Sequence, residues 1–379
     1  MTTPSPLSGR PVTIIGAGIG GLTAALALAQ RGARVRVLER AGRFREVGAG
    51  IQISPNAARV LDALGLADDF RAVSAPNPAV ALRDDRGDVV LRMDMARLRP
   101  GAAFRTIHRA RMIDLLETAA RAAGVEIALD TPVETLPDAP LLIGADSLHS
   151  RVRAALNGPE TPFFTGQTAW RALIPLEDGA EAGAQVFMGP GRHLVSYPLA
   201  HGLRNIVAVE ERDAWAGESW SERGDPDKLR RAFAGIAGPV PGWLAAITEC
   251  GIWGLHRHEV AQNWQDGTRA ILGDAAHPTL PFLAQGACMA IEDAWVLAAC
   301  LDADADQPRA LARYQALRRD RCVRIVAAAN ANARNYHLSG ARRRIGHTAL
   351  RLANRLSPRT VFERFAWVYD HDPTATHGS

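Results

Sequence analysis

The chain has 379 residues, 47% of them apolar and 22% charged, which is the composition of a globular protein large enough for two hydrophobic cores. The net charge is only +4, with 44 basic residues scattered among 40 acidic ones, so we expect no nucleic-acid partner. Because no run of 18 apolar residues and no apolar leader is present, we also expect no stable membrane insertion and no secretion.

The cysteines predict neither a metal site nor a disulfide framework. None of them forms a CxxC pair, and their spacing shows no pairing pattern: Cys250, Cys288, Cys300 and Cys322. A reducing, cytoplasmic location fits this usage best.

The first element in chain order is a βαβ unit. The apolar run 12–15 predicts a buried parallel strand, an alanine-rich helix follows, and 34–38 predicts a second strand. At the first turn, Gly16 permits the tight bend, Gly18 lets the backbone approach a pyrophosphate, and Gly21 brings helix and strand together. The unit therefore predicts a dinucleotide-binding domain.

Glu39 closes the second strand of this unit. At that position a carboxylate can accept both hydroxyls of an adenosine ribose and would repel a 2′-phosphate. We assign Arg40, the next residue, to the same cofactor-binding set. The motif by itself does not separate FAD from NAD.

The following segments alternate between helix and strand patterns. Residues 54–64 predict a helix with Ser54 as a possible cap, 79–93 predict a hairpin around an Asp-Arg-Gly turn, and 108–124 predict another helix. Strand patterns return at 125–130 and 141–146, as expected for further pieces of the cofactor domain.

The second half of the chain changes character. Residues 167–260 are β-rich and aromatic, with short strand candidates separated by turns, which predicts a separate antiparallel sheet. Residues 268–274 predict one more buried strand, and from Gln285 onward the pattern is mostly helical.

The predicted fold class is α/β. A Rossmann-like FAD-binding domain is interleaved with an antiparallel β-sheet substrate domain and is followed by a helical C-terminal segment. We expect the FAD-binding domain to comprise 10–75, 101–160 and 268–300, the substrate domain 76–100 and 161–267, and the C-terminal region 301–379.

Three motifs carry a resemblance to a known family. GAGIGGL, LLIGADSLHSRVR and ILGDAAHPTLPFLAQGACMAIEDA stand in the same order as in the group A flavoprotein monooxygenases, the FAD-dependent aromatic hydroxylases. The sequence resembles most closely their 3-hydroxybenzoate 6-hydroxylase, salicylate hydroxylase and 6-hydroxynicotinate monooxygenase branch. The resemblance implies FAD, NAD(P)H as co-substrate, O2, and hydroxylation of a small phenolic or N-heteroaromatic acid through a C4a-hydroperoxyflavin. No second GxGxxG is present, and the sequence leaves NADH and NADPH open.

The resemblance also assigns roles in the third motif. It implies that Asp274 accepts a hydrogen bond from the ribityl chain of FAD and that Pro281 fixes the backbone beside the flavin ring. The backbone N–H groups at Gly286 and Ala287 would then face the pyrimidine edge of the flavin, where a helix N-terminus stabilises negative charge. For His277 we expect a packed, turn-holding role rather than acid–base catalysis.

The middle motif departs from the family pattern at one residue. The family usually has Asp-Gly where this chain has Asp146 and Ser147, so a Cβ stands where glycine is expected. Asp146 and Arg151 would brace the pyrophosphate loop and the nucleotide groove. The resemblance further places Arg109 facing the FAD phosphates and Val133 at adenine, although Arg109 also suits a solvated helix start.

The substrate residues are predicted on the strand candidate RHLVSYPL. His193 and Tyr197 stand four residues apart and so share one face of a strand. In the resembling branch such a pair contacts the substrate phenol, and a neutral imidazole can take the phenol proton as a general base; the alternative is simple packing in the sheet. Gln52 resembles a position beside flavin and pocket. Three aromatic residues wall this pocket or belong to the core: Trp170, Trp253 and Phe282.

A different class of function remains open from the sequence. A reductase, an electron-transfer flavoprotein or a ligand sensor of the same fold would share the cofactor motifs without hydroxylating anything. The flavin halogenase branch is disfavoured because its WxWxIP segment is missing. We expect a monomer or a homodimer.

Overall fold

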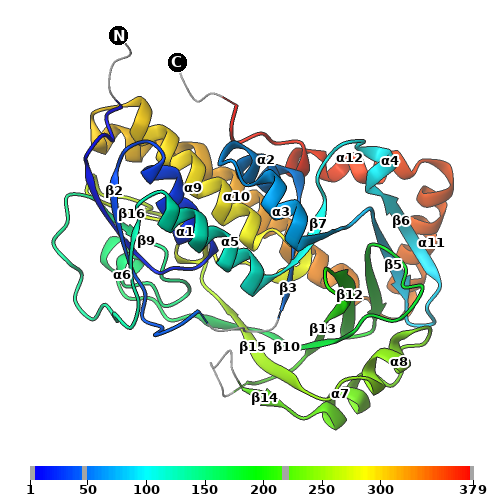
Figure 1. The fold of residues 1–379 in the computed structure, drawn as a ribbon. Coiled ribbons are helices and arrows are strands. Elements are labelled where there is room, and N and C mark those ends of the chain that lie inside the picture. The colour runs from blue at the N-terminus through cyan, green and yellow to red at the C-terminus, as the bar shows by residue number, and fades with distance from the viewer. Residues whose placement is uncertain (1–4, 45–48, 216–221, 376–379) are drawn as a thin grey trace.

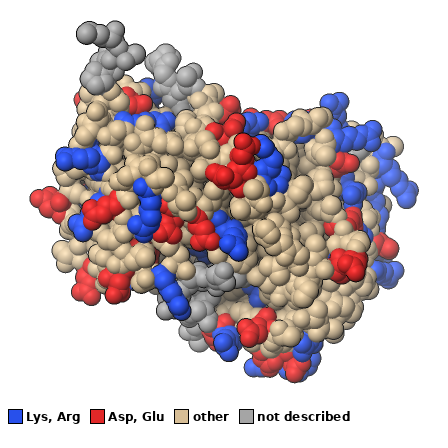
Figure 2. All heavy atoms as spheres, in the orientation of Figure 1, with Lys and Arg blue, Asp and Glu red and all other residues tan. Residues whose placement is uncertain are grey.

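The computed structural model describes residues 5–44, 49–215 and 222–375. Those parts of the three predicted domains that fall on 45–48, 216–221 and 376–379 lie outside the described residues. No helix in the described part of the chain has both the length and the apolar character that crossing a lipid bilayer requires. On the face shown in Figure 2, acidic and basic side chains are interspersed over most of the surface.

A five-stranded parallel sheet in the order β16-β9-β1-β2-β8 carries the cofactor motif (Figure 1). Its strands are β1 (Pro11–Ile15), β2 (Arg34–Leu38), β8 (Glu126–Ala128), β9 (Leu142–Gly144) and β16 (Arg269–Ile271). The strands predicted at 125–130, 141–146 and 268–274 are confirmed with shorter bounds. The central strand β1 buries Val12, Ile14 and Ile15, as a parallel strand covered on both faces must.

Helix α1 explains the alanine-rich stretch after the glycine turn. It spans Ile19–Ala29 and is buried along nearly its whole length, because it contacts both α5 (Arg109–Ala122) and α9 (Gly286–Ala303). Small side chains allow this close approach. A Cβ atom at Gly20 would lie 2.7 Å from Leu272 Cδ1 and 3.1 Å from Ala290 Cβ. Larger residues on this face would therefore push α1 away from the elements packed around it.

A second sheet has eight strands in the order β14-β15-β10-β13-β12-β11-β5-β6. Its strands are β5 (Ala79–Asp84), β6 (Val89–Asp94), β10 (Phe163–Pro175), β11 (Ala184–Gly189), β12 (Arg192–Leu199), β13 (Leu203–Glu211), β14 (Arg223–Gly224) and β15 (Cys250–Arg257). The predicted 79–93 hairpin is confirmed as β5 and β6. The sheet is mixed rather than wholly antiparallel, because β5 pairs with β11 in parallel. These two strands are joined through the other sheet and not by a hairpin, so no tight turn fixes their direction.

Two helices interrupt the stretch that was predicted to be β-rich. They are α7 (Pro226–Phe233) and α8 (Val240–Ala245). Asp225 caps α7 by accepting a hydrogen bond from the Asp227 amide at 2.8 Å, and Pro226 takes the first helical position. Leu229 and Phe233, four residues apart, then pack on one face of the sheet beside Trp170.

A small third sheet, β3-β7-β4, packs through β4 and β7 against β12 of the eight-stranded sheet. It consists of β3 (Gly50–Ile53), β4 (Ser74–Pro76) and β7 (Arg105–His108), with helices α2 (Pro55–Ala63), α3 (Ala67–Val73) and α4 (Met95–Leu98) nearby in sequence. Helix α6 (Arg151–Asn157) follows β9 of the parallel sheet. Ser54 stands at the α2 N-cap, but its side chain makes no capping bond. Its hydroxyl instead donates to Asn56 Oδ1 at 2.5 Å and accepts from Gln285 Nε2 at 2.9 Å.

The C-terminal part is helical, as predicted. It consists of α10 (Gln307–Tyr336), α11 (Gly340–Leu356) and α12 (Pro358–Tyr369). In Figure 1, α10 runs beside α9, while α11 and α12 contact β6 at the right of the view. The C-terminal helices therefore pack against α9 at one end and against β6 of the eight-stranded sheet at the other.

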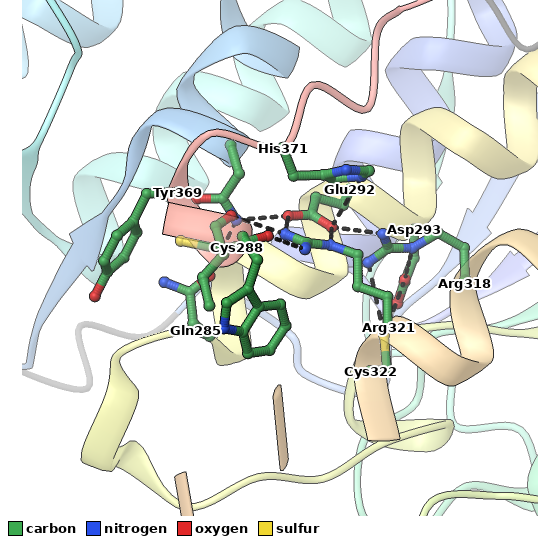
Figure 3. A network of polar contacts seen from close by, with 12 residues as sticks. Gln285, Cys288, Glu292, Asp293, Arg318, Arg321, Cys322, Tyr369 and His371 are labelled. Carbon is green, nitrogen blue, oxygen red and sulfur yellow. Dashed lines mark hydrogen bonds and ion pairs between the residues drawn. The ribbon is translucent and has the colours of Figure 1, made fainter. Parts of the chain in front are cut away.

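A buried network of charges holds α9 to its neighbours (Figure 3). Glu292 and Asp293 on α9 have no solvent exposure, and Arg318 of α10 donates to both, at 2.5 and 2.8 Å. Arg321 also binds Glu292, at 2.8 and 2.9 Å, and donates to the Trp367 and Val368 carbonyls before the C-terminus. Glu292 accepts a further bond from Asn56 of α2 at 2.5 Å. One acidic pair thus joins α2, α9, α10 and the end of α12.

The charges of this network compensate one another. Burial alone raises the pKa of Glu292, but Arg318 and Arg321 outweigh it and bring the pKa to about 2. For Asp293, burial is likewise outweighed by His277 and Arg318, and its pKa is also about 2. Both carboxylates therefore stay ionised in the folded protein. Removing one partner would leave an uncompensated buried charge.

We predict that Asp293→Asn lowers the free energy of unfolding at pH 7 by about 3–5 kcal/mol, because Arg318 and His277 lose a buried counter-charge. Acid should also destabilise the wild-type protein. Both folded-state pKa values lie below the ordinary values of 4.5 and 3.8, so this stability is present above pH 4.5 and lost as the pH falls toward 2. Urea unfolding followed by circular dichroism at pH 7 and pH 3.5 measures both effects.

Asp68→Asn is the matched control, because Asp68 forms an exposed ion pair with Arg71 within one helix. It should leave stability nearly unchanged. An Asp293→Asn protein as stable as the Asp68→Asn protein would contradict the assigned importance of the network.

Candidate active site

The glycine turn after β1 has the shape that a dinucleotide needs. Gly16 has φ +98°, and a Cβ there would lie 2.4 Å from the Ala145 carbonyl oxygen. A Cβ on Gly21 would lie 2.0 Å from the Gly16 carbonyl oxygen, so both glycines are required by packing. Gly18 differs, because a Cβ there would meet nothing within 4 Å. The backbone at Gly18 and the α1 N-terminus are thus open to a phosphate group.

Glu39 lies at the carboxyl end of β2, beside this turn. Its Oε2 accepts from the Ala17 amide at 2.8 Å and its Oε1 from the Ala41 amide at 2.9 Å. A carboxylate has about four acceptor positions, so lone pairs remain for two ribose hydroxyls. Arg40 is exposed next to it. The Thr131 amide donates to the Glu39 carbonyl at 2.8 Å, which brings the segment that leads to Val133 alongside.

Asp146 and Ser147 lie against the glycine turn, after β9. Asp146 Oδ2 accepts from the Arg151 amide at 2.8 Å and so helps to cap α6. Burial raises the pKa of Asp146, and hydrogen bonds from Ser150 and the start of α6 oppose this rise. Ser147 has φ +67°, which confirms that this chain places serine in a turn suited to glycine.

Asp274 lies just beyond β16, at the opposite end of the predicted cofactor path. Asp274 is exposed to solvent and lines a cavity of about 110 Å³ whose walls also include Pro281, Arg171, Trp253 and Ser147. Desolvation in this hollow raises the pKa of Asp274, while the nearby charges of His277 and Arg109 act in the opposite direction. The β16 strand, the 278–281 loop and the second sheet therefore meet at one cavity.

The loop from Pro281 leads into α9. Pro281 is exposed and begins the short helix η2 (Pro281–Leu283), and Ala284 then takes φ +53°, a second left-handed residue that is not glycine. Gly286 and Ala287 form the first turn of α9 and are half-buried. Their amides have no acceptor within the helix, as at every helix N-terminus, so they can bind a ligand.

His193 and Tyr197 share one face of β12, as predicted. Both are buried, and this face points away from α7 and α8 toward α10 and β3. A Cβ on Gly50 of β3 would lie 2.7 Å from the Tyr197 ring, and the Gly50 amide donates to Asn205 Oδ1 at 2.7 Å. Burial raises the pKa of the Tyr197 hydroxyl well above its ordinary value, so it stays protonated and can donate a hydrogen bond.

His193 lies beside the loop that enters α9. Its ring centroid is 5.0 Å from that of Phe282 and 5.2 Å from that of Tyr336. Burial and the neighbouring His337 lower the pKa of His193 well below its ordinary value, so the imidazole is neutral at pH 7. Trp170 lies on the opposite face of the sheet, within the core against α7, whereas Trp253 and Phe282 pack on the His193 side.

Gln52 and the two sheet residues are not part of the cavity at Asp274. Among the described residues, the lining of that cavity includes neither Gln52, His193 nor Tyr197. Gln52 is half-buried on β3, and its Oε1 accepts from Asn77 Nδ2 at 3.0 Å. The structure thus groups Asp274 with Pro281 in one cavity and places the sheet residues next to it, across Phe282.

Arg171 is a site residue that the sequence analysis missed. It is on β10, where Ala169, Arg171 and Leu173 alternate with residues of the α7 face, so it projects to the same side as Tyr197. Its guanidinium lies 4.3 Å from the centre of the Trp253 ring and lines the Asp274 cavity. Burial and the nearby Arg109 lower its pKa to about 10, and it is still a cation at pH 7. The sequence feature that could have identified Arg171 is an arginine at an inward-facing position of an otherwise apolar strand.

His277 has the packed role that was expected. It has no solvent exposure, and its Nε2 lies 2.5 Å from Asp293 Oδ2. His277, Asp293 and Cys322 place possible metal-ligand atoms within 4.8 Å of one another. Arg318 already donates to both Asp293 and Cys322, so the local charge is balanced by a guanidinium rather than by a metal ion.

These features define an α/β protein with a dinucleotide-binding turn on a parallel sheet and a separate mixed sheet. The FAD binding domain family matches residues 10–139 and 134–329. The chain is 35% identical to 3-amino-4-hydroxybenzoate 2-monooxygenase of Streptomyces platensis, over 95% of this chain and 96% of the relative. It is 33% identical to 3-hydroxybenzoate 6-hydroxylase of Polaromonas naphthalenivorans, over 95% of each.

Solved structures agree with these relatives. The structure of Klebsiella pneumoniae HpxO complexed with FAD and uric acid has a TM-score of 0.80 and 28% identity, and covers 92% of this chain and 94% of that one. The chain belongs to the FAD-binding family of flavoprotein monooxygenases. The resemblance and the α/β fold that the sequence indicated are confirmed, and so are the enzyme class and the cofactors FAD and NAD(P)H.

We predict that Ser147→Gly raises the free energy of unfolding by a few tenths to about 1 kcal/mol, because glycine relieves the left-handed conformation at φ +67°. NAD(P)H-driven flavin reduction should be unchanged or faster. Urea unfolding and anaerobic stopped-flow reduction measure the two properties. Ser74→Gly, at a serine with φ −126°, is the control and should be destabilising. A clear loss of NAD(P)H affinity in Ser147→Gly would instead make the serine hydroxyl a ligand contact.

Proposed function

We propose that this flavoprotein monooxygenase hydroxylates a small aromatic carboxylic acid that already bears a ring hydroxyl. The overall reaction would convert substrate, NAD(P)H, a proton and O2 into hydroxylated product, NAD(P)+ and water. One observation carries the proposal. A single face of the eight-stranded sheet carries a half-buried cation, Arg171, together with the buried side chains of Tyr197 and His193, and this face lies against β3 and the loop between Asp274 and α9.

Arg171 supports a carboxylate-bearing substrate. A half-buried guanidinium that lines a small cavity favours an anion, and its planar donors match a carboxylate. The Trp253 ring and Leu280 line the same cavity and suit an aromatic ring. The two relatives named above act on hydroxybenzoates.

His193 and Tyr197 support a ring hydroxyl. His193 is neutral and can accept a proton from a ring hydroxyl, and Tyr197 is protonated and can donate a hydrogen bond to the substrate. An ionised hydroxyl makes the ring richer in electrons and so more reactive toward an electrophilic oxygen donor. We assign Gln52 and Pro281 to the flavin side of the pocket, with Gln52 on β3 and Pro281 in the lining of the Asp274 cavity.

The cofactor would lie along the path from the glycine turn to α9. Bound FAD supplies the redox chemistry that activates O2. In this proposal the pyrophosphate and ribose contacts come from the first turn and its neighbours, and the flavin contacts from the third motif. The pyrophosphate and ribose contacts would come from Gly16, Gly18, Gly21, Glu39, Arg40, Arg109, Val133 and Asp146. The flavin contacts would come from Asp274, Gly286 and Ala287.

The remaining assignments concern the whole chain. We propose that 10–75, 101–160 and 268–300 form the FAD-binding domain, 76–100 and 161–267 the substrate domain, and 301–379 the C-terminal region. The described strands of each large sheet fall within these ranges. All four cysteines are free and buried, which supports a cytoplasmic location. We propose a monomer or a homodimer.

Oxygen uptake on adding NADH or NADPH to the purified enzyme, with a panel of hydroxybenzoates and hydroxypyridine carboxylates, tests the function. Product mass spectrometry should show one added oxygen atom for each NAD(P)H in the coupled case. Peroxide as the only product with every acid would favour an electron-transfer flavoprotein of the same fold.

We predict that His193→Ala retains FAD, slows ring hydroxylation by about 100-fold or more, and diverts reducing equivalents to peroxide. Tyr197→Phe should act in the same direction but less severely, because it removes only a hydrogen bond. The measurement is hydroxylated product per NAD(P)H consumed. His201→Asn, at an exposed histidine in the turn after β12, is the control and should behave as wild type. Normal coupling with a raised KM in His193→Ala would limit His193 to substrate binding.

A further inference from the structure

Three side chains form a hydrogen-bonded chain from the interior of the sheet to its surface. His193 Nδ1 lies 2.7 Å from His337 Nε2, and His337 Nδ1 lies 2.8 Å from Glu211 Oε1. His193 is 1% exposed and His337 7%, whereas the Glu211 side chain is 57% exposed. The chain therefore crosses from a closed environment to solvent through two imidazole rings.

The Glu211 carboxylate at the outer end determines which ring nitrogen of each histidine carries a proton. A carboxylate only accepts hydrogen bonds, so His337 must carry its proton on Nδ1 and leave Nε2 as an acceptor. His193 must then donate from Nδ1, which leaves its own Nε2 unprotonated. No hydrogen bond from the described residues reaches that Nε2. The exposed carboxylate thus sets the buried histidine in the tautomer that can accept a proton from a substrate hydroxyl.

His193, at the buried end, needs a group to which it can pass a proton. Burial lowers the pKa of His193, and burial also lowers that of His337 although Glu211 opposes it. An imidazolium confined to His193 would therefore be unfavourable, and a proton taken there would soon return to the substrate. Transfer to an exposed carboxylate, and from there to water, makes the removal of the proton effective.

The fold holds the three side chains from three different elements. His193 is on β12, Glu211 ends β13, and His337 immediately follows α10. The Glu211 amide donates to the Gly191 carbonyl at 2.9 Å, and the Gly191 amide donates to the His337 carbonyl at 3.4 Å. Glu211 borders an open hollow of about 650 Å³ that water can fill.

Among the described residues, few other ionisable groups lie beside His193, His337 and Glu211. Tyr336 of α10 packs on His193, with its pKa raised to about 12 by burial, so it does not exchange protons near neutral pH. Arg212, Asp213, Arg257 and Arg334 line the hollow beside Glu211. Arginines do not release protons at these pH values, so the two histidines and the nearby carboxylates are the groups able to move one.

We propose that His193, His337 and Glu211 form a proton relay that carries the proton of the substrate hydroxyl to solvent. The inference rests on the proposed function, because it needs a hydroxylated aromatic substrate at His193. The substrate O–H bond breaks and its proton goes to His193 Nε2. The Nδ1 proton of His193 passes to His337 Nε2, the Nδ1 proton of His337 passes to Glu211, and Glu211 releases it to water. His193 is the catalytic residue, and His337 and Glu211 are positioning residues that act through it.

His337→Gln and Glu211→Gln in the FAD-loaded enzyme test the relay. With the hydroxybenzoate that the wild-type enzyme hydroxylates, His337→Gln should slow hydroxylation about tenfold or more near pH 7. The deficit should shrink toward pH 10, where a phenolic hydroxyl ionises without a base. FAD content and the rate of flavin reduction should match wild type. Added imidazole should restore part of the rate.

Glu211→Gln changes an exposed side chain and so keeps the test independent of folding. Its amide oxygen still accepts from His337, but it cannot take the proton, so we expect a loss of about threefold with KM unchanged. An indicator dye in weakly buffered solution should show proton release on substrate binding in wild type and slower release in both variants. Glu210→Gln is the matched control, because Glu210 binds Arg212 and Trp170 on the other side of the same strand.

The outcomes separate the relay from the proposed function. A deficit that is equal at every pH and is not rescued by imidazole would make His337 a structural clamp and overturn the relay. Wild-type coupling and proton release in both variants would overturn it as well, while leaving the hydroxylase function intact. A wild-type enzyme that hydroxylates no phenolic acid would refute the proposed function, and the relay with it, since no substrate proton would remain to be carried.

Discussion

The pairing of two buried carboxylates on α9 with arginines of α10 is the constraint on which this structure depends most. Glu292 and Asp293 lie six and seven residues inside the helix whose first turn faces the predicted flavin position. An ionised pair in the interior is stable only when its counter-charges are held in place. The network therefore fixes α9 relative to α2, α10 and the chain end, and with it the direction of the helix N-terminus.

The second constraint is the meeting of one sheet face with the loop that enters α9. Strands β10 and β12 turn their other face to α7 and α8, where apolar side chains form a separate core. The face toward the cofactor domain instead carries Arg171, His193 and Tyr197 among apolar neighbours. The α7 side also buries a charged group, Arg204, but that group has partners in Ser196 and Glu177. Arg171 instead lines the Asp274 cavity, and for this reason we propose that the face toward the cofactor domain is the functional one.

Two described residues other than glycine have a left-handed backbone at the cofactor motifs. Ser147 follows β9 and Ala284 precedes α9, and each has a positive φ that glycine adopts more easily. Such strain persists only where surrounding contacts determine the turn. Asp146 is bonded to the start of α6, and Gln285 donates to Ser54 and accepts from Asn56, so both turns are held from the adjacent residue.

The sequence by itself determined the local elements and the family. Glycine spacing, the acid at Glu39 and the period-two strands depend on neighbours within about 30 residues, so the βαβ unit, the interleaved order and the cofactor motifs could be predicted. Only the tertiary structure decided the rest. The parallel pairing of β5 with β11, the place of Arg171 beside Asp274, and the contact of His193 with His337 join residues about 100 or more positions apart. No periodicity encodes such contacts, because they arise when separately formed layers pack together.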